Sequence, residues 1–287
     1  MKKVAFLSMD TLDDFVCYDS LLFEPLHKLG WKAETVSWRD KQVNWNDYDV
    51  VLIRSCWDYQ DDHTQFLSVL QSIEQSSAQL ENKLELVNWN LDKKYLRELE
   101  HAGIKIVPTL WMSGFSRSQI MGFFEELDTQ EIVIKPNISA NADDTFKLTP
   151  EKALLSATSL QKIFAQRDYM VQPFMQGIVD EGEYSLFFFA DEFSHCILKK
   201  PKARDFRVQE EHGGILTSVE PEPELLACAG KVLKSVNPKP LYSRVDFVRT
   251  GAGFALMELE IIEPSLYFNM DSNSAGRFAR VFANWIN

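Results

Sequence analysis

Short apolar runs and longer segments with helical spacing alternate through the first ninety residues. The apolar runs predict strands and the amphipathic segments predict helices, because side chains repeat about every two residues in a strand and about every 3.6 in a helix. The predicted strands cover residues 4–9, 32–38 and 50–55, and the predicted helices cover residues 15–29 and 64–83. Continuous apolar strands that alternate with helices are typical of a small doubly wound α/β domain.

From about residue 88 the predicted elements follow a different order that includes hairpins. The predicted helices cover residues 91–101, with Asn90 as N-cap, 116–127, 151–165, 223–236 and 274–286. The predicted strands cover residues 106–109, 131–136, a short stretch near 146, 169–174, and a hairpin of 183–190 with 193–200. The chain therefore divides into an N-terminal α/β domain at 1–87 and two further α/β (α+β) units at 88–170 and 171–287.

Residues 243–264, SRVDFVRTGAGFALMELEIIEP, predict a β-hairpin with acidic side chains on one face. If a glycine-containing turn joins the strands, Asp246 lies opposite Glu258 and Arg244 lies opposite Glu260. Like charges opposed across a ladder are destabilising. Three carboxylates on one face therefore need a cation, and Mg²⁺, which binds through oxygen ligands, suits them. The alternative is a set of solvated edge carboxylates paired with Arg244.

Charged residues also follow two of the predicted strands, and ligands of doubly wound sheets bind at such strand ends. Arg54 could clamp a substrate carboxylate there, or Arg54 and Asp58 could simply pair with each other. Lys135 ends the strand 131–136, before a loop of small residues that could lie over phosphates; a solvated lysine is the alternative. Neither G-x-G-x-x-G nor G-x-x-x-x-G-K-[ST] occurs, which argues against a dinucleotide-binding Rossmann domain and a P-loop NTPase.

The composition narrows the classes of partner. A formal net charge of −12 argues against nucleic acid and anionic membranes as partners, and no apolar stretch approaches the roughly 20 residues that span a bilayer. The four cysteines are scattered, as in a reduced intracellular protein. We therefore expect a soluble cytoplasmic protein. The densest positive charge, at residues 199–207, is either a solvated loop or a clamp for phosphate groups.

Six segments of the chain, taken in their order, indicate a resemblance to a known family. They are WNLDKKYL (89–96), VIKPNISANADDT (133–145), VQPF (171–174), EGEYSLFFF (181–189), SRVDFV (243–248) and MELEIIEPSL (257–266). Together they resemble the ATP-grasp superfamily, and within it the glutathione-synthetase-like branch that includes the D-cycloserine-forming cyclising ligase. The resemblance covers nearly all of residues 88–287. It implies an ATP-grasp fold in which ATP is sandwiched between the central unit at 88–170 and the C-terminal unit at 171–287.

The resemblance implies a set of residues that bind ATP and Mg²⁺. The lysines that hold the phosphates match Lys93 and Lys135, the linker that reads adenine matches Gln172, Pro173, Phe174 and Met175, and the Mg²⁺ ligands match Asp246, Glu258 and Glu260. Glu183, or Glu181 nearby, is a candidate for the ribose hydroxyls. Two departures stand out. Asn and Ala replace paired glycines after Lys135, and Glu260 replaces the asparagine of better-known relatives.

Two arginines match catalytic positions of relatives. Arg244 matches an arginine that serves the substrate carboxylate and the developing oxyanion in D-alanine–D-alanine ligase. Arg207 lies in a segment similar to the arginine-bearing loop of glutathione synthetase. The resemblance thus implies an ADP-forming ligase that phosphorylates a substrate carboxylate and joins the acylphosphate to an amine, with ring closure as a variant.

The implied partners are a small amino-acid or peptide-like carboxylate, an amine, ATP and Mg²⁺. Two Mg²⁺ ions are expected, Mn²⁺ could replace them, and a homodimer is left open. The alternatives are a kinase for a small hydroxylated substrate and a nucleotide-binding module without turnover. A metallohydrolase that uses the carboxylates alone is a lesser alternative, because no histidine lies near them in the sequence.

Overall fold

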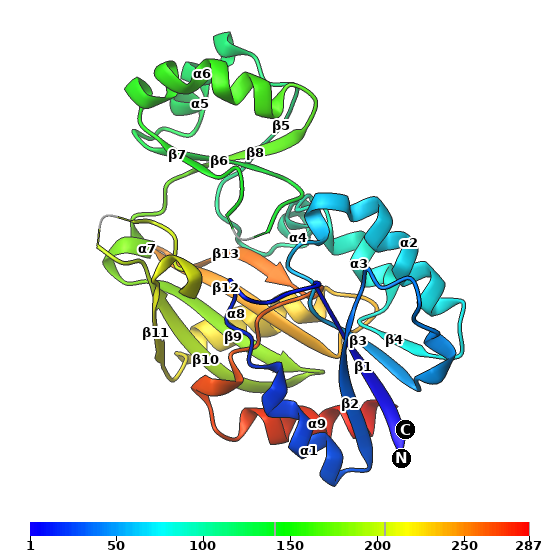
Figure 1. Cartoon of the computed structure of the whole chain (residues 1–287). Coiled ribbons are helices and arrows are strands. Elements are labelled where there is room, and N and C mark those ends of the chain that lie inside the picture. Colours follow the sequence, from blue (N-terminus) through cyan, green and yellow to red (C-terminus); the bar gives the residue numbers. More distant parts are fainter. Residues whose placement is uncertain (141, 204, 287) are drawn as a thin grey trace.

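The computed structural model describes residues 1–140, 142–203 and 205–286, which form three sheets with helices around them (Figure 1). The first sheet is parallel, with strand order β2-β1-β3-β4. Its strands are β1 (Lys2–Ser8), β2 (Trp31–Ser37), β3 (Val50–Ser55) and β4 (Gln79–Glu81). Its helices are α1 (Phe23–Lys28) and α2 (His63–Glu74), with 3₁₀ turns at Asp19–Leu22, Trp45–Asp47 and Tyr59–Asp62. The predicted parallel α/β arrangement is confirmed.

Both predicted helices of this region are longer than the helices that form. The predicted helix 64–83 is wrong beyond Glu74, because the chain turns there and residues 79–81 become β4. The Ser76 hydroxyl donates to the carbonyl of Ile73 at 2.6 Å, and such local side-chain bonds compete with helix continuation. The predicted helix 15–29 is reduced to a 3₁₀ turn and α1. Pro25 lies in the first turn of α1, where its missing N–H costs nothing.

Two short helices, α3 (Leu84–Asn90) and α4 (Tyr95–His101), follow the first sheet. Asn90 is not the predicted N-cap but the last residue of α3. Its side-chain amide donates to the carbonyl of Leu259 at 2.9 Å and accepts from the N–H of Ile261 at 3.3 Å. Tyr95 adds a further contact, because its hydroxyl accepts from the N–H of Leu259 at 2.9 Å. These side chains therefore join α3 and α4 to the edge of the C-terminal sheet.

The second sheet is antiparallel, with order β5-β8-β6-β7, and stands apart from the other two in Figure 1. Its strands are β5 (Leu110–Ser113), β6 (Ile132–Pro136), β7 (Phe146–Leu148) and β8 (Asp168–Pro173). A 3₁₀ turn at Arg117–Gln119, α5 (Ile120–Glu126) and α6 (Pro150–Phe164) cover one face of it. Residues 170 and 171, between which we predicted a domain boundary, both lie within β8.

The predicted strand 106–109 does not form. Ile106 makes a single bridge with Leu256 of β13 (Gly253–Glu260), and β5 begins only at Leu110. Pro108 lies in the middle of the predicted segment, and it has no N–H to donate to a ladder.

The third sheet has five antiparallel strands in the order β11-β10-β9-β12-β13. They are β9 (Glu183–Phe189), β10 (Glu192–Lys200), β11 (Ile215–Ser218), β12 (Tyr242–Thr250) and β13. The helices of this part are α7 (Gly177–Asp180), α8 (Pro223–Lys234) and α9 (Ser274–Ile286), with 3₁₀ turns at Glu210–His212 and Phe268–Met270. The predicted pairing is confirmed, because Asp246 faces Glu258 and Arg244 faces Glu260.

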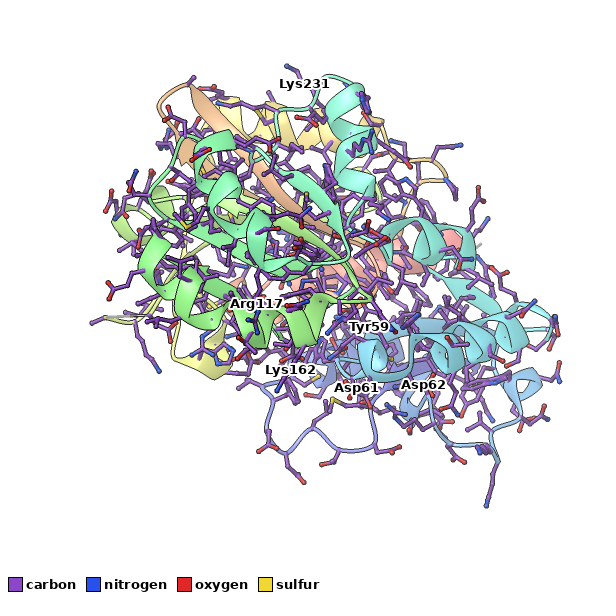
Figure 2. All side chains as sticks on the ribbon, turned by 90° about the horizontal axis from the view of Figure 1, so that it is seen from above. Tyr59, Asp61, Asp62, Arg117, Lys162 and Lys231 are labelled. Carbon is purple, nitrogen blue, oxygen red and sulfur yellow. The ribbon has the colours of Figure 1, made fainter. Side chains whose placement is uncertain are left out.

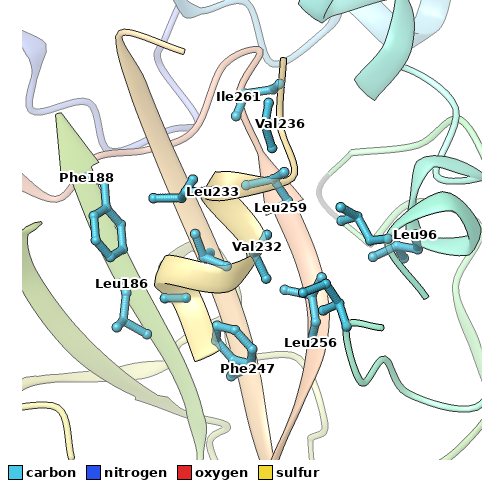
Figure 3. Close-up of a cluster of buried hydrophobic side chains, with 14 of the residues drawn as sticks. Leu96, Leu186, Phe188, Val232, Leu233, Val236, Phe247, Leu256, Leu259 and Ile261 are labelled. Atoms are coloured by element: carbon cyan, nitrogen blue, oxygen red, sulfur yellow. The ribbon is translucent and has the colours of Figure 1, made fainter. Parts of the chain in front are cut away.

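The two faces of this sheet are divided by strand alternation. Leu186, Phe188 and Phe247 point toward α8, where they pack with Val232 and Leu233 (Figure 3). On the opposite face, Phe187, Phe189 and Tyr242 pack with Phe278 and Phe282 of α9 and with the first sheet. Arg244 and Asp246 follow Tyr242 in alternation, so they lie on this second face, beyond its apolar part. The charged side chains therefore begin where the core ends.

Candidate active site

A cavity is lined by the second and third sheets and by Phe15, Trp57 and Tyr59, which follow strands of the first sheet. β12 and β13 contribute Arg244, Asp246, Glu258 and Glu260 to it, and the segment between α3 and α4 contributes Lys93. We call these five residues the charged wall. Asp246 is only 2% exposed and Lys93 and Arg244 are each 8% exposed. The hairpin thus presents its charges to a confined space and not to bulk solvent.

Each carboxylate of the charged wall contacts a cationic side chain. The Lys93 Nζ lies 3.0 Å from Oε1 of Glu258 and also donates to the carbonyl of Ser139 at 2.7 Å. The Arg244 guanidinium donates to Oδ2 of Asp246 at 3.0 Å and also contacts Glu260. A buried carboxylate without such a partner would be strongly destabilising. The wall is therefore an interleaved array of opposite charges.

The pKa values show how closely the charges balance. Burial opposes ionisation of Glu258, but Lys93 and Lys135 outweigh it, so the pKa of Glu258 is lowered. Burial, with repulsion from Glu258 and Asp246, outweighs Arg244 at Glu260 and raises the pKa of Glu260 to about 7. Negative charge is thus in slight excess on this wall, and a further cation would be stabilised there.

The wall supplies only oxygen donors of the kind that Mg²⁺ prefers. Within the described part of the chain, no three His, Cys, Asp or Glu side chains are grouped closely enough to hold a metal ion as they stand. The carboxylates lie with Lys93 and Arg244 instead. Their oxygen chemistry and the raised pKa of Glu260 fit a divalent cation, and the lysine and arginine side chains would have to move to admit it.

The second sheet supplies the opposite side of the cavity. Lys135 ends β6 and lines the cavity, and burial lowers the pKa of its ammonium group despite the nearby Glu258 carboxylate. Four residues that end β8 and follow it, Gln172, Pro173, Phe174 and Met175, also line the cavity. The Phe174 ring packs against Phe206 and lies under the ammonium of Lys147, 3.4 Å from it.

Of the two glutamates predicted to contact the ribose, only one lines the cavity. Glu183 lines the cavity and pairs with Lys199. Glu181 does not line it, because its carboxylate pairs with Arg249 at 2.8 Å outside the cavity. Arg207 lines the cavity and donates from Nη2 to Oδ2 of Asp205 at 3.0 Å. Arg204 and Asn141, in the predicted positive segment and the small-residue loop, lie outside the described residues.

Arg54 and Asp58 lie apart from the charged wall, and they do not pair with each other. Arg54 is 1% exposed, and its guanidinium pairs with Asp19 at 2.8 Å and donates to the carbonyl of Pro264 at 3.2 Å. Asp58 accepts from Trp38 Nε1 at 2.7 Å and from Arg39 at 2.9 Å. Arg54 therefore has no access to a substrate in this arrangement, whereas Asp58 lines a second cavity next to the main one.

The second cavity is acidic. Its carboxylates are Asp14, Asp58, Asp61, Asp143 and Glu211, and no Lys or Arg of the described residues lines it. We call it the acidic cavity. It shares Phe15, Trp57, Gln209 and Glu211 with the main cavity, so the two border each other. Asp61 lies in the same 3₁₀ turn as Tyr59, just before α2 (Figure 2), and Tyr59 lines the main cavity.

Sequence reasoning did not single out two buried charged residues of the main cavity. Lys199 is 3% exposed and lies between Glu183 and Asp246; it was included only as part of a positive segment. Glu263 is 8% exposed, and burial together with the Glu260 charge raises its pKa to about 8. Glu263 lies in the quoted segment MELEIIEPSL, but it follows the strand, so alternation could not place it.

Comparison with known proteins agrees with this architecture. Residues 4–82 match the family model described as D-cycloserine synthetase DcsG, N-terminal domain. The cycloserine biosynthesis protein DcsG of Streptomyces lavendulae is 27% identical over 278 residues, which are 91% of each chain. The crystal structure of D-cycloserine synthetase DcsG superposes with a TM-score of 0.88 at 24% identity, over 99% of this chain and 100% of that one.

A structure of the ATP-grasp ligase PsnB, complexed with a phosphomimetic variant of its minimal precursor, Mg and ADP, superposes with a TM-score of 0.69 at 14% identity. It covers 99% of this chain and 98% of its own. The chain has the ATP-grasp fold. The predicted resemblance to the ATP-grasp superfamily and to its D-cycloserine-forming branch is confirmed. None of the helices in the described residues of this ATP-grasp chain is long and apolar enough to cross a membrane.

Proposed function

We propose that this chain is an ATP- and Mg²⁺-dependent, ADP-forming carboxylate–amine ligase that acts on a small amino-acid or peptide-like substrate. One observation carries the proposal: buried Lys93, half-buried Lys135 and three carboxylates from different elements surround one cavity. Phosphoryl transfer depends mainly on positioning and charge neutralisation, which this arrangement supplies without a side-chain nucleophile. The relatives named cycloserine biosynthesis protein and ATP-grasp ligase support the same reading.

In the proposed reaction Lys93 and Lys135 hold phosphate oxygens, and Gln172 to Met175 hold the adenine. Glu183 is the better-placed candidate for the ribose, since Glu181 pairs outside the cavity. Arg244 and Arg207 are placed to neutralise charge that develops as a substrate carboxylate attacks the γ-phosphate. The amine then displaces phosphate from the acylphosphate.

Mg²⁺ bound by Asp246, Glu258 and Glu260 would neutralise phosphate oxygens and so favour the transfer. Two ions are expected, and Mn²⁺ should substitute for them. Lys93 and Arg244, which contact these carboxylates now, are long and flexible, so both can turn toward the phosphates. Cytoplasmic location, three domains with boundaries near 88 and 171, and a homodimer remain expectations of the same proposal.

The test is release of ADP and phosphate from ATP and Mg²⁺ in the presence of mixed amino acids and small peptides. ADP formation that requires both a carboxylate and an amine is the expected result. A stable phosphorylated product formed without an amine would favour the kinase alternative. Binding of Mg²⁺-ATP without ADP release under any mixture would favour a binding module.

A further inference from the structure

Glu263 differs in one respect from the other buried or half-buried carboxylates that line the main cavity. Glu183 pairs with Lys199, Glu258 with Lys93, and Asp246 and Glu260 with Arg244. Glu263 is 8% exposed, yet within the described part of the chain its carboxylate has no Lys, Arg or His nitrogen within 4.0 Å. Buried carboxylates are usually paired, so an unpaired one that lines a cavity indicates a missing cationic partner.

The backbone around Glu263 is held rigidly from the first sheet. The indole N–H of Trp57 donates to the carbonyl of Glu263 at 2.9 Å. The Arg54 guanidinium donates to the next carbonyl, that of Pro264, at 3.2 Å. Both donors lie at or just after the end of β3, so the unpaired carboxylate is a positioned feature of the site and not a loose loop side chain.

The surroundings of Glu263 separate positive from negative charge. Lys93, Lys135, Lys199 and Arg244 lie along the charged wall and β6, where phosphates are proposed to bind. The acidic cavity borders the main one, and Trp57, which lines both, donates to the Glu263 carbonyl. A cavity lined by one sign of charge raises the local concentration of the opposite ion. Glu263 therefore lies next to the region where the acidic cavity borders the main one, and negative charge there favours a cation.

We propose that Glu263 binds the ammonium group of the substrate whose carboxylate is phosphorylated, and so selects an amino acid that carries a free amine. The inference rests on the proposed ligase function. Glu263 is thus a specificity-determining residue, and the amine that it holds stays protonated and is not the nucleophile. The acidic cavity supplies long-range attraction for the same group.

Trapping with hydroxylamine separates recognition of the ammonium group from the need for an attacking amine. The carboxylate and ATP give an acylphosphate and ADP, and hydroxylamine then displaces phosphate to give a hydroxamic acid. The probes are L- and D-alanine and L- and D-serine, with propionate and 3-hydroxypropionate as the matched acids that lack the amine. The proteins are the wild type, Glu263→Gln, and Glu85→Gln, which makes the same change on an exposed residue of α3.

We expect the wild type and Glu85→Gln to form hydroxamate from at least one amino acid and far less from its deaminated partner. Glu263→Gln should lower kcat/KM for the amino acid by about 30-fold or more, because a buried charge pair is lost. It should leave kcat/KM for the deaminated acid and the affinity for Mg²⁺-ATP unchanged. This loss of discrimination is a result that a purely structural role would not produce.

Three results would overturn the inference. Equal use of amino and deaminated acids by the wild type would mean that no ammonium group is recognised, while the ligase function would stand. A loss of Mg²⁺-ATP affinity in Glu263→Gln would assign Glu263 to the metal instead. Hydroxamate from none of the acids, with wild-type Mg²⁺-ATP binding intact, would remove both the proposed function for these substrates and the inference that rests on it.

Discussion

The charged wall and the acidic cavity carry negative charge in opposite ways. On the wall, each carboxylate contacts Lys93 or Arg244 and the network is nearly neutral. In the acidic cavity, only Asp58 has a cationic partner nearby, Arg39, and no Lys or Arg of the described residues lines the space. A network in which carboxylates and cationic side chains lie together is suited to a ligand that carries both signs of charge, such as a metal–phosphate complex. The acidic cavity, whose carboxylates mostly lack a cationic partner, is suited to a cation.

Glu258→Gln should have the largest effect, and it tests whether the charged wall binds the metal–phosphate complex. The change removes a charge that contacts Lys93, and we expect turnover of Mg²⁺-ATP to fall by about 10³-fold, or about 4 kcal/mol, while the fold is retained. ADP release and circular dichroism would measure the two effects. Glu100→Gln, on an exposed position of α4, is the control. Activity near the wild-type level would remove Glu258 from the site.

Arg54→Leu tests whether Arg54 is structural, as its burial indicates. The variant leaves Asp19 buried without its cation, so the free energy of unfolding should drop by about 3 kcal/mol. Chemical denaturation measures this loss. Asp19→Asn combined with Arg54→Leu should recover part of it, because the stranded charge is then absent. A stability equal to that of the wild type, with a raised KM for the acid substrate, would restore the predicted substrate role.

Lys135→Ala should weaken Mg²⁺-ATP binding by about 30-fold, or roughly 2 kcal/mol, because a confined ammonium group facing the phosphates is lost. Isothermal titration calorimetry gives the affinity. The matched control is Lys162→Ala on α6, an exposed lysine of the same part of the chain (Figure 2). Unchanged affinity in Lys135→Ala would contradict the phosphate role.

The smallest expected effect concerns a histidine outside both cavities. His195 stacks on Phe187, and burial lowers its pKa to about 4. Between pH 6.5 and 4, His195 is protonated in the unfolded chain but largely neutral in the folded chain. Protonation therefore favours unfolding, and the free energy of unfolding falls as pH falls from 7 toward 4. Between pH 7 and 5 the loss is about 2 kcal/mol. His195→Gln should flatten this dependence in chemical denaturation, and His101→Gln should not.

The sequence predicted best where one local rule decides the structure. Alternation and a glycine-containing turn gave the pairing of Asp246 with Glu258, and the amphipathic pattern gave α9 at residues 274–286. Prediction failed where residues distant in the sequence determine the contacts of a side chain. Arg54 was expected to face a ligand or Asp58, but its partner is Asp19, 35 positions away. Glu263 follows a strand, so no periodicity indicated which way its side chain points.

The contacts of α3 and α4 with β13 have a consequence for association. β13 is the outer strand of its sheet, and an open outer strand can recruit a strand from another molecule. Here its backbone groups are already occupied: Leu256 exchanges hydrogen bonds with residues 105–107, Leu259 with Tyr95 and Asn90, and Ile261 with Asn90 and Asn82. The strand that carries Glu258 and Glu260 is thereby protected against edge-to-edge aggregation.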